Sequence, residues 1–472
     1  MSKERLSRVL ERLGQRQQGG ALAGLMELLR VPSVSAKSAH ADDCRRCAAW
    51  LAERFRACGL KAEVCETGGG RGRPAVVAEG PSVAGRPTLL LYGHYDVQPP
   101  EPLELWHTPP FEPTVRRTDA GTEAVFARGA ADDKGQVYAH LEAIAAWQAE
   151  GGLPVNLKVL IEGEEEVGSA NLEAFIAENA ARLRADIAVI SDTGQFARGV
   201  PALTYGLRGL VYEEMTLTGP SHDLHSGGYG GFAPNPGNVL CKLIASLHDE
   251  QGRVNLPGFY DDVEPLTEAE RAAWAKLPFD VQRECAEIGI PFDSGEAGYT
   301  PLERLWARPT CDVNGLTCGY QGEGAKTVLP SRASCKVSFR LVPRQDPQKV
   351  LASFRAAMRQ RCPENVKLEF ANHGASPAVV VPVDTPAAKL ALAAIEAGFG
   401  RPATFIRGGG SIPVVGTLKR ELGIDTLLVG FGLPDDRVHS PNEKFELESL
   451  YAGMRTCAVL YARLAELPSG RA

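Results

Sequence analysis

VNLKVLIEGEEEVGS, residues 155–169, joins a short apolar run directly to four closely spaced glutamates. The run Val155–Ile161 predicts a buried strand, so the carboxylates follow at its carboxyl end. Acidic runs usually form solvated faces of a protein. Carboxylates delivered by a buried strand are different, because they repel one another, lose hydration and are stabilised by a bound cation. One carboxylate of such a site can bind metal while its neighbour keeps a raised pKa and acts as a base.

This strand belongs to an alternating series of strands and helices. Short apolar strands separated by amphipathic helices indicate an α/β layer with a largely parallel sheet. The pattern covers the N-terminal part of the chain and returns near its end. Strands are predicted over 88–92, 155–161, 187–190 and 425–429, and helices over 3–30, 42–58, 136–150, 172–183, 385–398 and 447–464.

The middle of the chain has a different pattern. Residues 210–217 and 333–341 alternate polar with apolar side chains, as half-buried antiparallel strands do. Two helical segments, near 236–250 and 347–361, accompany these strands. We therefore expect a separate α+β domain with an antiparallel sheet, residues 209–382, inserted into an α/β domain made of residues 1–208 and 383–472.

The composition excludes several classes of protein. The chain has 472 residues, of which 44% are hydrophobic and 23% charged, as in a globular protein. Its 51 Lys and Arg against 58 Asp and Glu give a formal charge of −7, so it lacks the basic footprint of a nucleic-acid or anionic-membrane binder. No apolar run approaches the roughly 20 residues of a membrane helix. The charged start, Met-Ser-Lys-Glu-Arg, has no apolar h-region, so we expect no signal peptide.

The cysteines indicate a reducing environment. There are 11 of them, an odd number scattered through a long chain, which does not suit a secreted disulfide framework. Cys44 and Cys47 form a CxxC pair that no second pair answers. Their helical context favours ordinary thiols on a helix over a redox or zinc pair. We therefore expect a cytoplasmic protein.

Four further segments place ionisable residues beside predicted strands or helices. His94 follows the strand at 88–92, and Asp96 could orient its imidazole as a carboxylate beside a metal ligand does. A lone surface histidine is the alternative. Asp132 and Asp133 precede a helix, where they would either cap it or supply an oxygen ligand.

The last two of these segments complete the set. Asp192 follows the strand at 187–190, and His439 and Glu443 come after the last predicted strand. Ligands of an open α/β sheet gather outside the carboxyl ends of its strands. Two histidines and several carboxylates meeting there would suit zinc, as one ion or a pair.

Two other patterns do not support a function. Residues 319–327 resemble a phosphate-binding loop, but Ala325 separates the glycine from the lysine and the segment lies in the antiparallel region. A nucleotide-dependent ligase is therefore disfavoured. Residues 408–411 contain no G-x-S-x-G turn, so a serine hydrolase is unsupported.

Taken together, these segments resemble the dinuclear-zinc aminoacylase and dipeptidase family. That family includes carnosine dipeptidases, carboxypeptidase G, acetylornithine deacetylase and succinyl-diaminopimelate desuccinylase. The family's motifs occur in order as GHYDVQP (93–99), ARGAADDKG (127–135), EGEEEVGS (162–169), SDT (191–193) and HSPNEK (439–444). The similarity is greatest to carnosinase-like dipeptidases, through TYGLRG (204–209), DLHSGGYGG (223–231), GAKTVLP (324–330), SFRLVP (338–343) and GGSIPV (409–414).

The resemblance implies two divalent metal ions per subunit, with zinc as the expected metal and manganese or cobalt as alternatives. Asp132 would bridge the two ions. His94 and Asp192 would complete one site, and Glu166 and His439 the other.

The resemblance also implies the catalytic groups. Glu165 would be the general base acting on a metal-bridging water, and Asp96 would orient His94. The peptide bond between Asp132 and Asp133 would be cis. Residues 1–208 and 383–472 would form the zinc-peptidase catalytic domain.

The inserted domain, 209–382, would serve as a lid and dimerisation domain. His225 matches a histidine that reaches the active site of the partner subunit in a homodimer and stabilises an oxyanion. Thr327, Arg340 and Ser411 match residues that hold the substrate's C-terminal carboxylate and neighbouring groups. Gly408 departs from the family pattern, because close relatives often have Glu at this position.

The implied reaction is hydrolysis of the amide bond in dipeptides or small peptides. An N-acyl amino-acid deacylase of the deacetylase or desuccinylase type, using the same metal centre, is the alternative. A non-catalytic peptide-binding dimer is a third possibility, but such a protein has no need of the general base Glu165. No nucleic-acid or membrane partner is expected.

Overall fold

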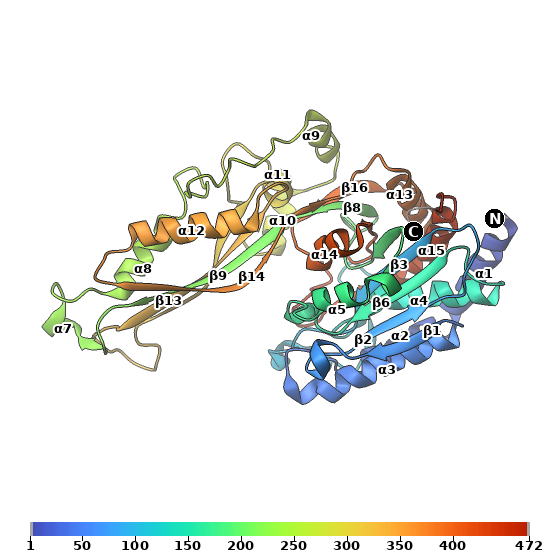
Figure 1. Ribbon diagram of the computed structural model, residues 1–472, viewed down its shortest axis with the longest axis horizontal. Coiled ribbons are helices and arrows are strands. Elements are labelled where there is room, and N and C mark those ends of the chain that lie inside the picture. Colours follow the sequence, from blue (N-terminus) through green and yellow to red (C-terminus); the bar gives the residue numbers. More distant parts are fainter. Residues whose placement is uncertain (1–2, 470–472) are drawn as a thin grey trace. The chain divides into compact units, whose positions relative to one another are not determined.

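The computed structural model describes residues 3–469 and divides the chain into two compact units (Figure 1). Unit 1 consists of the described residues within Met1–Tyr205, Val381–Ile406 and Val414–Ala472. Unit 2 consists of Gly206–Val380 and Arg407–Pro413. Each unit has a hydrophobic core of its own. The short segment Arg407–Pro413, which carries Ser411, thus groups with the inserted region rather than with its neighbours in sequence.

The largest sheet has four parallel strands at its centre. Its order is β1-β2-β6-β3-β7-β17-β8-β15, with β16 also paired to β8. Pairing is parallel between β6 and β3, β3 and β7, and β7 and β17. These strands confirm the expected mostly parallel sheet. The strands are β1 (Lys61–Cys65), β2 (Ala75–Glu79), β3 (Thr88–His94), β6 (Asn156–Glu162), β7 (Ile187–Ile190), β8 (Ala202–Leu207), β15 (Val379–Val380), β16 (Thr404–Gly408) and β17 (Asp425–Leu428).

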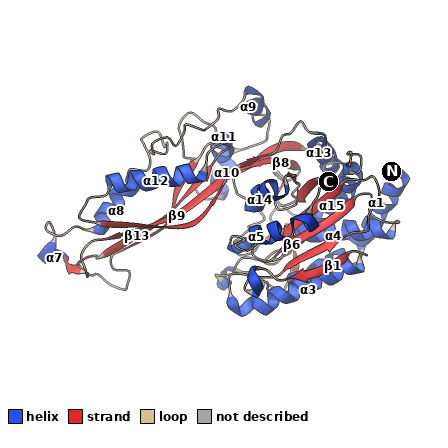
Figure 2. Cartoon of the chain, viewed as in Figure 1, coloured by secondary structure: helices blue, strands red, loops and turns tan. Residues whose placement is uncertain are grey.

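Helices pack around this sheet, as Figure 2 shows in blue. α4 is buried almost all round, including Lys134 and Gln136, because it packs against β3 and several helices rather than presenting one apolar face. The helix expected over 3–30 is two helices, broken where Gly20 takes a φ of 107°. The helices of unit 1 are α1 (Lys3–Gln18), α2 (Ala21–Leu29), α3 (Ala41–Ala57), α4 (Lys134–Ala149), α5 (Leu172–Glu178), α6 (Ala180–Leu183), α13 (Pro386–Phe399), α14 (Pro413–Leu422, whose first residue belongs to unit 2) and α15 (Leu447–Leu464).

Unit 1 also contains a small three-stranded antiparallel sheet. Its order is β18-β5-β4, from Lys444–Glu446, Glu123–Phe126 and Thr114–Arg117. Phe445 pairs with Val125, which ties the end of the chain to the segment preceding α4. This pairing brings the loop after residue 434 toward the loop at 127–133.

Unit 2 is an α+β unit built on a four-stranded antiparallel sheet, as expected. The sheet order is β11-β13-β9-β14, from Thr310–Cys318, Arg332–Leu341, Gly209–Thr218 and Lys367–Ser376. Helices α8 and α12 pack on this sheet and share its core. The other elements are α7 (Ser226–Tyr229), α8 (Pro236–Ala245), α9 (Glu268–Trp274), α10 (Val281–Glu287), α11 (Pro301–Ala307), α12 (Pro347–Arg361), β10 (Leu224–His225) and β12 (Val328–Leu329).

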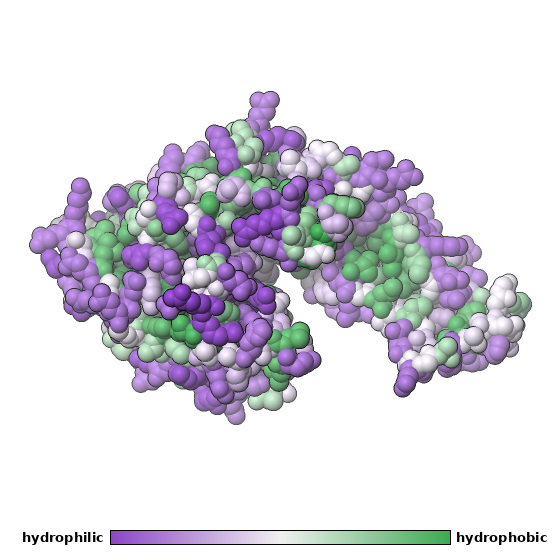
Figure 3. All heavy atoms as spheres, turned by 180° about the vertical axis from the view of Figure 1, so that it is seen from behind, coloured by the Kyte–Doolittle hydropathy of each residue, from purple (hydrophilic) through white to green (hydrophobic). Residues whose placement is uncertain are grey.

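The cysteines form no disulfide bond, in agreement with the sequence-based expectation. All 11 cysteines are free thiols, and Cys44 and Cys47 are buried on α3. Among residues 3–469, no helix combines the length and the apolar character needed to cross a membrane. The face shown in Figure 3 is mostly hydrophilic, with separate apolar patches.

Candidate metal centre

The candidate site lies at the carboxyl ends of the parallel strands of unit 1. His94 is the last residue of β3 and pairs in register with Glu162, the last residue of β6. Asp192 follows the end of β7 by two residues. Because parallel strands end at one edge of a sheet, side chains that follow them are brought together there.

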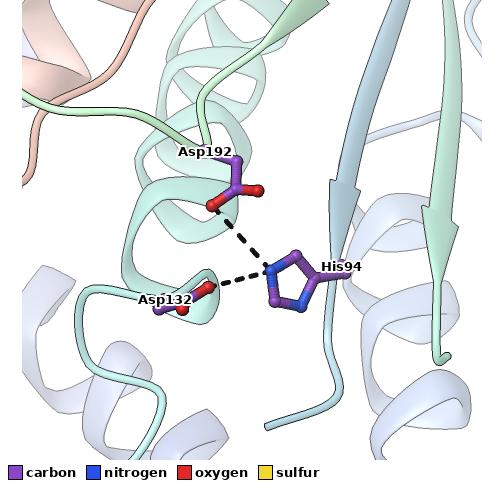
Figure 4. Close-up of side chains that lie close together, drawn as sticks. All are labelled: His94, Asp132 and Asp192. Carbon is purple, nitrogen blue, oxygen red and sulfur yellow. Dashed lines mark hydrogen bonds and ion pairs between the residues drawn. The ribbon is translucent and has the colours of Figure 1, made fainter. Parts of the chain in front are cut away.

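His94, Asp132 and Asp192 form the first group of potential metal ligands. The Nε2 atom of His94 lies 3.0 Å from Oδ1 of Asp132 and 3.9 Å from Oδ1 of Asp192. Both aspartates point toward the imidazole (Figure 4). One ligand atom from each residue lies within 4.8 Å of the others.

Asp132, Glu166 and His439 form the second group. Nε2 of His439 lies 3.0 Å from Oδ2 of Asp132 and 3.1 Å from Oε2 of Glu166. These ligand atoms also lie within 4.8 Å of one another. Asp132 therefore offers one carboxylate oxygen to each group, which is the arrangement of a bridging ligand.

The electrostatics show an excess of buried negative charge. Burial raises the pKa of Asp192, and the nearby Asp132 raises it further. Burial also raises the pKa of Glu165 to about 7; His94 opposes this shift, while Glu166 and Asp132 add to it. Hydrogen bonds with Asp132 and Glu166 raise the pKa of His439 to about 10. The buried carboxylates of Asp192 and Glu165 therefore favour the protonated form unless a positive charge lies nearby.

The donor set fits divalent metal ions. Each group combines one imidazole nitrogen with two carboxylates, the ligand types that zinc accepts. With three protein ligands in each group, a bound ion would keep an open coordination position, as in catalytic rather than structural zinc sites. Cations would also relieve the repulsion among these buried carboxylates.

Asp96 contacts residues of both groups. Its main-chain oxygen is 3.1 Å and its Oδ1 atom 3.5 Å from Nδ1 of His94. Its two carboxylate oxygens also accept hydrogen bonds from the main-chain N–H groups of Glu165 (3.2 Å) and Glu166 (3.1 Å). Asp96 therefore contacts the histidine of one group and the glutamate-bearing turn of the other. The contact with the turn was not foreseen from the sequence.

Glu443, which the sequence placed beside His439 among the candidate carboxylates, belongs to neither group of potential ligands and supports the site instead. Its buried carboxylate accepts hydrogen bonds from Nη1 of Arg128 (2.8 Å) and from the main-chain N–H groups of Gly129 (2.8 Å), Ala131 (2.9 Å) and Asp132 (3.1 Å). Glu443 thus ties the loop that carries Asp132 to the segment that carries His439. Arg128 and Glu443 each stand in a matched motif, but nothing in either motif indicates that the two residues pair.

The backbone around the ligands has unusual geometry. The Asp132–Asp133 peptide bond is cis, which confirms what the resemblance implied. His439 has a positive φ of 63°, an uncommon value for a residue other than glycine. Gln98 was also missed; its Nε2 donates to Oε2 of Glu166 at 2.8 Å.

A cavity adjoins the first group of ligands within unit 1. It has a volume of about 380 Å³ and includes Asp132 and Asp192 in its wall. Thr193, Gln195 and Leu433 also line it. The cavity provides space for a small ligand beside the carboxylates.

The four expected substrate-binding residues all lie in unit 2, where they form two separate pairs. His225 and Thr327 are neighbours, because β10 pairs with β12 and the Ser226 N–H donates to the carbonyl of Thr327. Arg340 donates from Nη1 to Oγ of Ser411 at 3.0 Å. Arg340 lies eight residues along β13 from the end nearest the first pair, about 27 Å at the usual rise of a strand. Within one chain, unit 2 therefore does not bring the two pairs together.

Comparison with known proteins agrees with this geometry. The model of peptidase family M20/M25/M40 matches residues 90–463. The Cys-Gly metallodipeptidase DUG1 of Candida albicans is 36% identical over 383 residues, covering 78% of this chain and 77% of that protein. The human Beta-Ala-His dipeptidase is 33% identical, covering 84% and 78%.

Solved structures agree as well. The structure of the dipeptidase Dug1p from Saccharomyces cerevisiae superposes with a TM-score of 0.85 at 28% identity, covering 98% of this chain and 99% of that one. This similarity extends over both units of the chain.

Proposed function

The chain belongs to peptidase family M20/M25/M40 and is a metallodipeptidase, a hydrolase of peptide bonds, and we propose that it works with a pair of divalent metal ions. The observation that carries this proposal is the position of Asp132. Its two oxygens face two different sets of ligands, each with one histidine and one further carboxylate. A single structural ion would not require such a shared carboxylate.

In this proposal, His94 and Asp192 hold one ion, Glu166 and His439 hold the other, and Asp132 bridges them. The mixture of imidazole and carboxylate ligands suits zinc, while manganese and cobalt share these ligand types. When bound, the ions supply Lewis acidity, which polarises the scissile carbonyl and makes water more acidic.

Glu165 is the proposed general base. Its carboxyl is held near the metal ligands by the hydrogen bond from its own N–H to Asp96. A pKa of about 7, raised mainly by burial, lets the carboxylate take a proton from water and return it to the leaving amine at neutral pH. Asp96 acts as a positioning residue for both Glu165 and His94.

Unit 2 is proposed to recognise the substrate and to form a homodimer. Arg340 and Ser411 would hold the C-terminal carboxylate of the dipeptide. His225 would act in the active site of the partner subunit, and Thr327, its neighbour in unit 2, would accompany it. The separation of this pair from Arg340 within one chain supports such an arrangement. Eleven free thiols support the proposed cytoplasmic location.

A substrate panel tests the proposed function. Purified protein is assayed with Cys-Gly, β-Ala-His and L-Ala-Gly, and in parallel with N-acetyl and N-succinyl amino acids. We expect cleavage of dipeptides, loss of activity with EDTA, and recovery on adding zinc or manganese. Metal analysis should find about two ions per subunit. Cleavage of acyl amino acids without dipeptides would establish the deacylase alternative instead. Activity that survives complete removal of metal would refute the metal-dependent mechanism.

A further inference from the structure

Unit 2 contains two neighbouring arginines without an acidic partner. Arg208 and Arg340 both contact Ser411: Arg340 donates to its Oγ, and that hydroxyl donates to the carbonyl of Arg208. Within residues 3–469, no carboxylate lies within 4.0 Å of either guanidinium. Asp312, the nearby acid, accepts a hydrogen bond from the Thr310 hydroxyl instead.

Two other arginines of unit 2, Arg308 and Arg355, are paired with carboxylates. Arg308 makes two hydrogen bonds of 2.7 Å to the carboxylate of Glu296, and Arg355 donates to Glu213 at 2.7 Å. These pairs satisfy the guanidinium groups within the fold. Unpaired charges that are partly removed from water are costly, so a proximate pair of them indicates an anionic ligand.

Arg208 is attached to the loop that carries Ser411. Its N–H donates to the carbonyl of Gly410 at 3.1 Å, and its Nε donates to the carbonyl of Gly409 at 2.9 Å. The terminal nitrogens Nη1 and Nη2 make no hydrogen bond with any described residue. A Cβ atom at Gly409 would lie only 3.3 Å from Nη2, so glycine leaves the guanidinium its space.

We propose that Arg208 is a specificity-determining residue that binds the C-terminal carboxylate of the substrate together with Arg340. The Nε atom holds the loop with Ser411 in place, and the terminal nitrogens donate to the carboxylate. This inference rests on the proposed function of the site. It adds a second guanidinium to the carboxylate site proposed for Arg340 and Ser411, so that a peptide amide would leave two guanidiniums without a counter-ion.

The charge environment agrees with this role. Burial lowers the pKa of Arg208 to about 10, and the charge of Arg340 lowers it further. An anion placed between the two arginines would attract both guanidinium groups and offset the repulsion between them. Planar guanidinium groups also match the geometry of a carboxylate better than an ammonium group does.

The test compares a free acid with its amide. Arg208→Gln, Arg208→Lys and Arg340→Gln are assayed with L-Ala-Gly and L-Ala-glycinamide, after their metal content and melting temperature are shown to match the wild type. Arg332→Gln is the control, because Arg332 is an exposed arginine at the opposite end of β13. We expect Arg208→Gln to lower kcat/KM for the acid by about 10- to 100-fold, mainly through KM, and to change that for the amide by less than about threefold.

Arg208→Lys should recover part of the preference for the acid, since it restores the charge without the planar fork. Equal losses for acid and amide would show that Arg208 only supports the loop, and an unchanged preference would show that it does not bind the carboxylate. Either result overturns the inference.

A second measurement separates this inference from the proposed function. Calorimetric binding of the same two ligands is measured in a Glu165→Gln background, with and without Arg208→Gln. If Arg208→Gln abolishes the preference for the acid in this background, the inference is supported. This holds even if the wild-type protein cleaves no dipeptide, a result that would refute only the proposed function. If only Arg340→Gln removes the preference, the carboxylate site stands and Arg208 is not part of it.

Discussion

Replacing Glu443 by alanine should damage both the stability of unit 1 and its affinity for metal. Glu443 and Arg128 form an ion pair in which both side chains are 1% exposed. The same carboxylate accepts the main-chain hydrogen bonds of Gly129, Ala131 and Asp132. The substitution therefore leaves a buried guanidinium without a counter-ion and three N–H groups without their acceptor.

The expected magnitude follows from these contacts. Breaking a buried ion pair by removing one partner typically costs about 3–5 kcal/mol of the free energy of unfolding. Loosening Asp132, which faces both groups of ligands, should lower metal affinity by about 10- to 100-fold, as the loss of supporting contacts usually does. Glu448→Ala on α15 is the control: its carboxylate is 67% exposed and pairs with Arg455, so we expect a change below about 1 kcal/mol.

Urea unfolding of the metal-free proteins gives the stability, because bound metal would add stabilisation by mass action. Competition with a chromophoric chelator gives the metal affinity. Arg128→Met combined with Glu443→Leu should recover much of the stability, since no charge then stays buried and unpaired. It should not recover metal affinity, because the loop still lacks its acceptor. A stability within about 1 kcal/mol of wild type and unchanged metal binding for Glu443→Ala would refute this account of Glu443.

Four further substitutions provide two tests of the site and one of the pH dependence of stability. Glu165→Gln should lower kcat by about 10²- to 10⁴-fold while both metal ions stay bound, and near-normal turnover would contradict its role as general base. Asp132→Asn should release both ions, whereas Asp192→Asn should weaken only one; metal analysis after dialysis distinguishes a bridging ligand from an ordinary one. His140 is buried between Tyr461 and Ser191, and burial lowers its pKa from 6.5 to about 3. Between these values the unfolded chain binds a proton that the folded chain does not, so stability should fall as the pH drops, by up to about 1.4 kcal/mol per pH unit. His140→Gln should flatten this slope in urea unfolding measured from pH 7 to 4, and an unchanged slope would assign it to other groups.

The elements with strong local patterns were predicted well from sequence. The helix expected at 347–361 matches α12 residue for residue, because Pro347 begins it and its apolar positions recur at helical spacing. The helix expected over 3–30 was wrong as one helix, because the chain breaks at Gly20, whose positive φ of 107° is readily adopted by glycine. The apolar spacing of α4 did not reveal that this helix is enclosed on nearly all sides.

The candidate site could be anticipated because several of its ionisable residues stand at or just after the ends of predicted strands. His94, Asp192 and the glutamates after β6 stand at positions that the order of strands and helices along the chain brings to one edge. The supporting contacts were not accessible in this way. Glu443 lies 311 to 315 residues from the groups it binds, and no local pattern reports such a partner.

The sequence alone therefore determined the types of the elements, the chemistry of the ligands and the family that they resemble, because propensity, periodicity and motif spacing are local properties of the chain. Only the tertiary structure decided which oxygen of Asp132 faces which histidine, and that Arg208 stands beside Arg340 without a counter-ion. These are distances between segments far apart in sequence, and they are set by the packing of whole sheets and cores rather than by neighbouring residues.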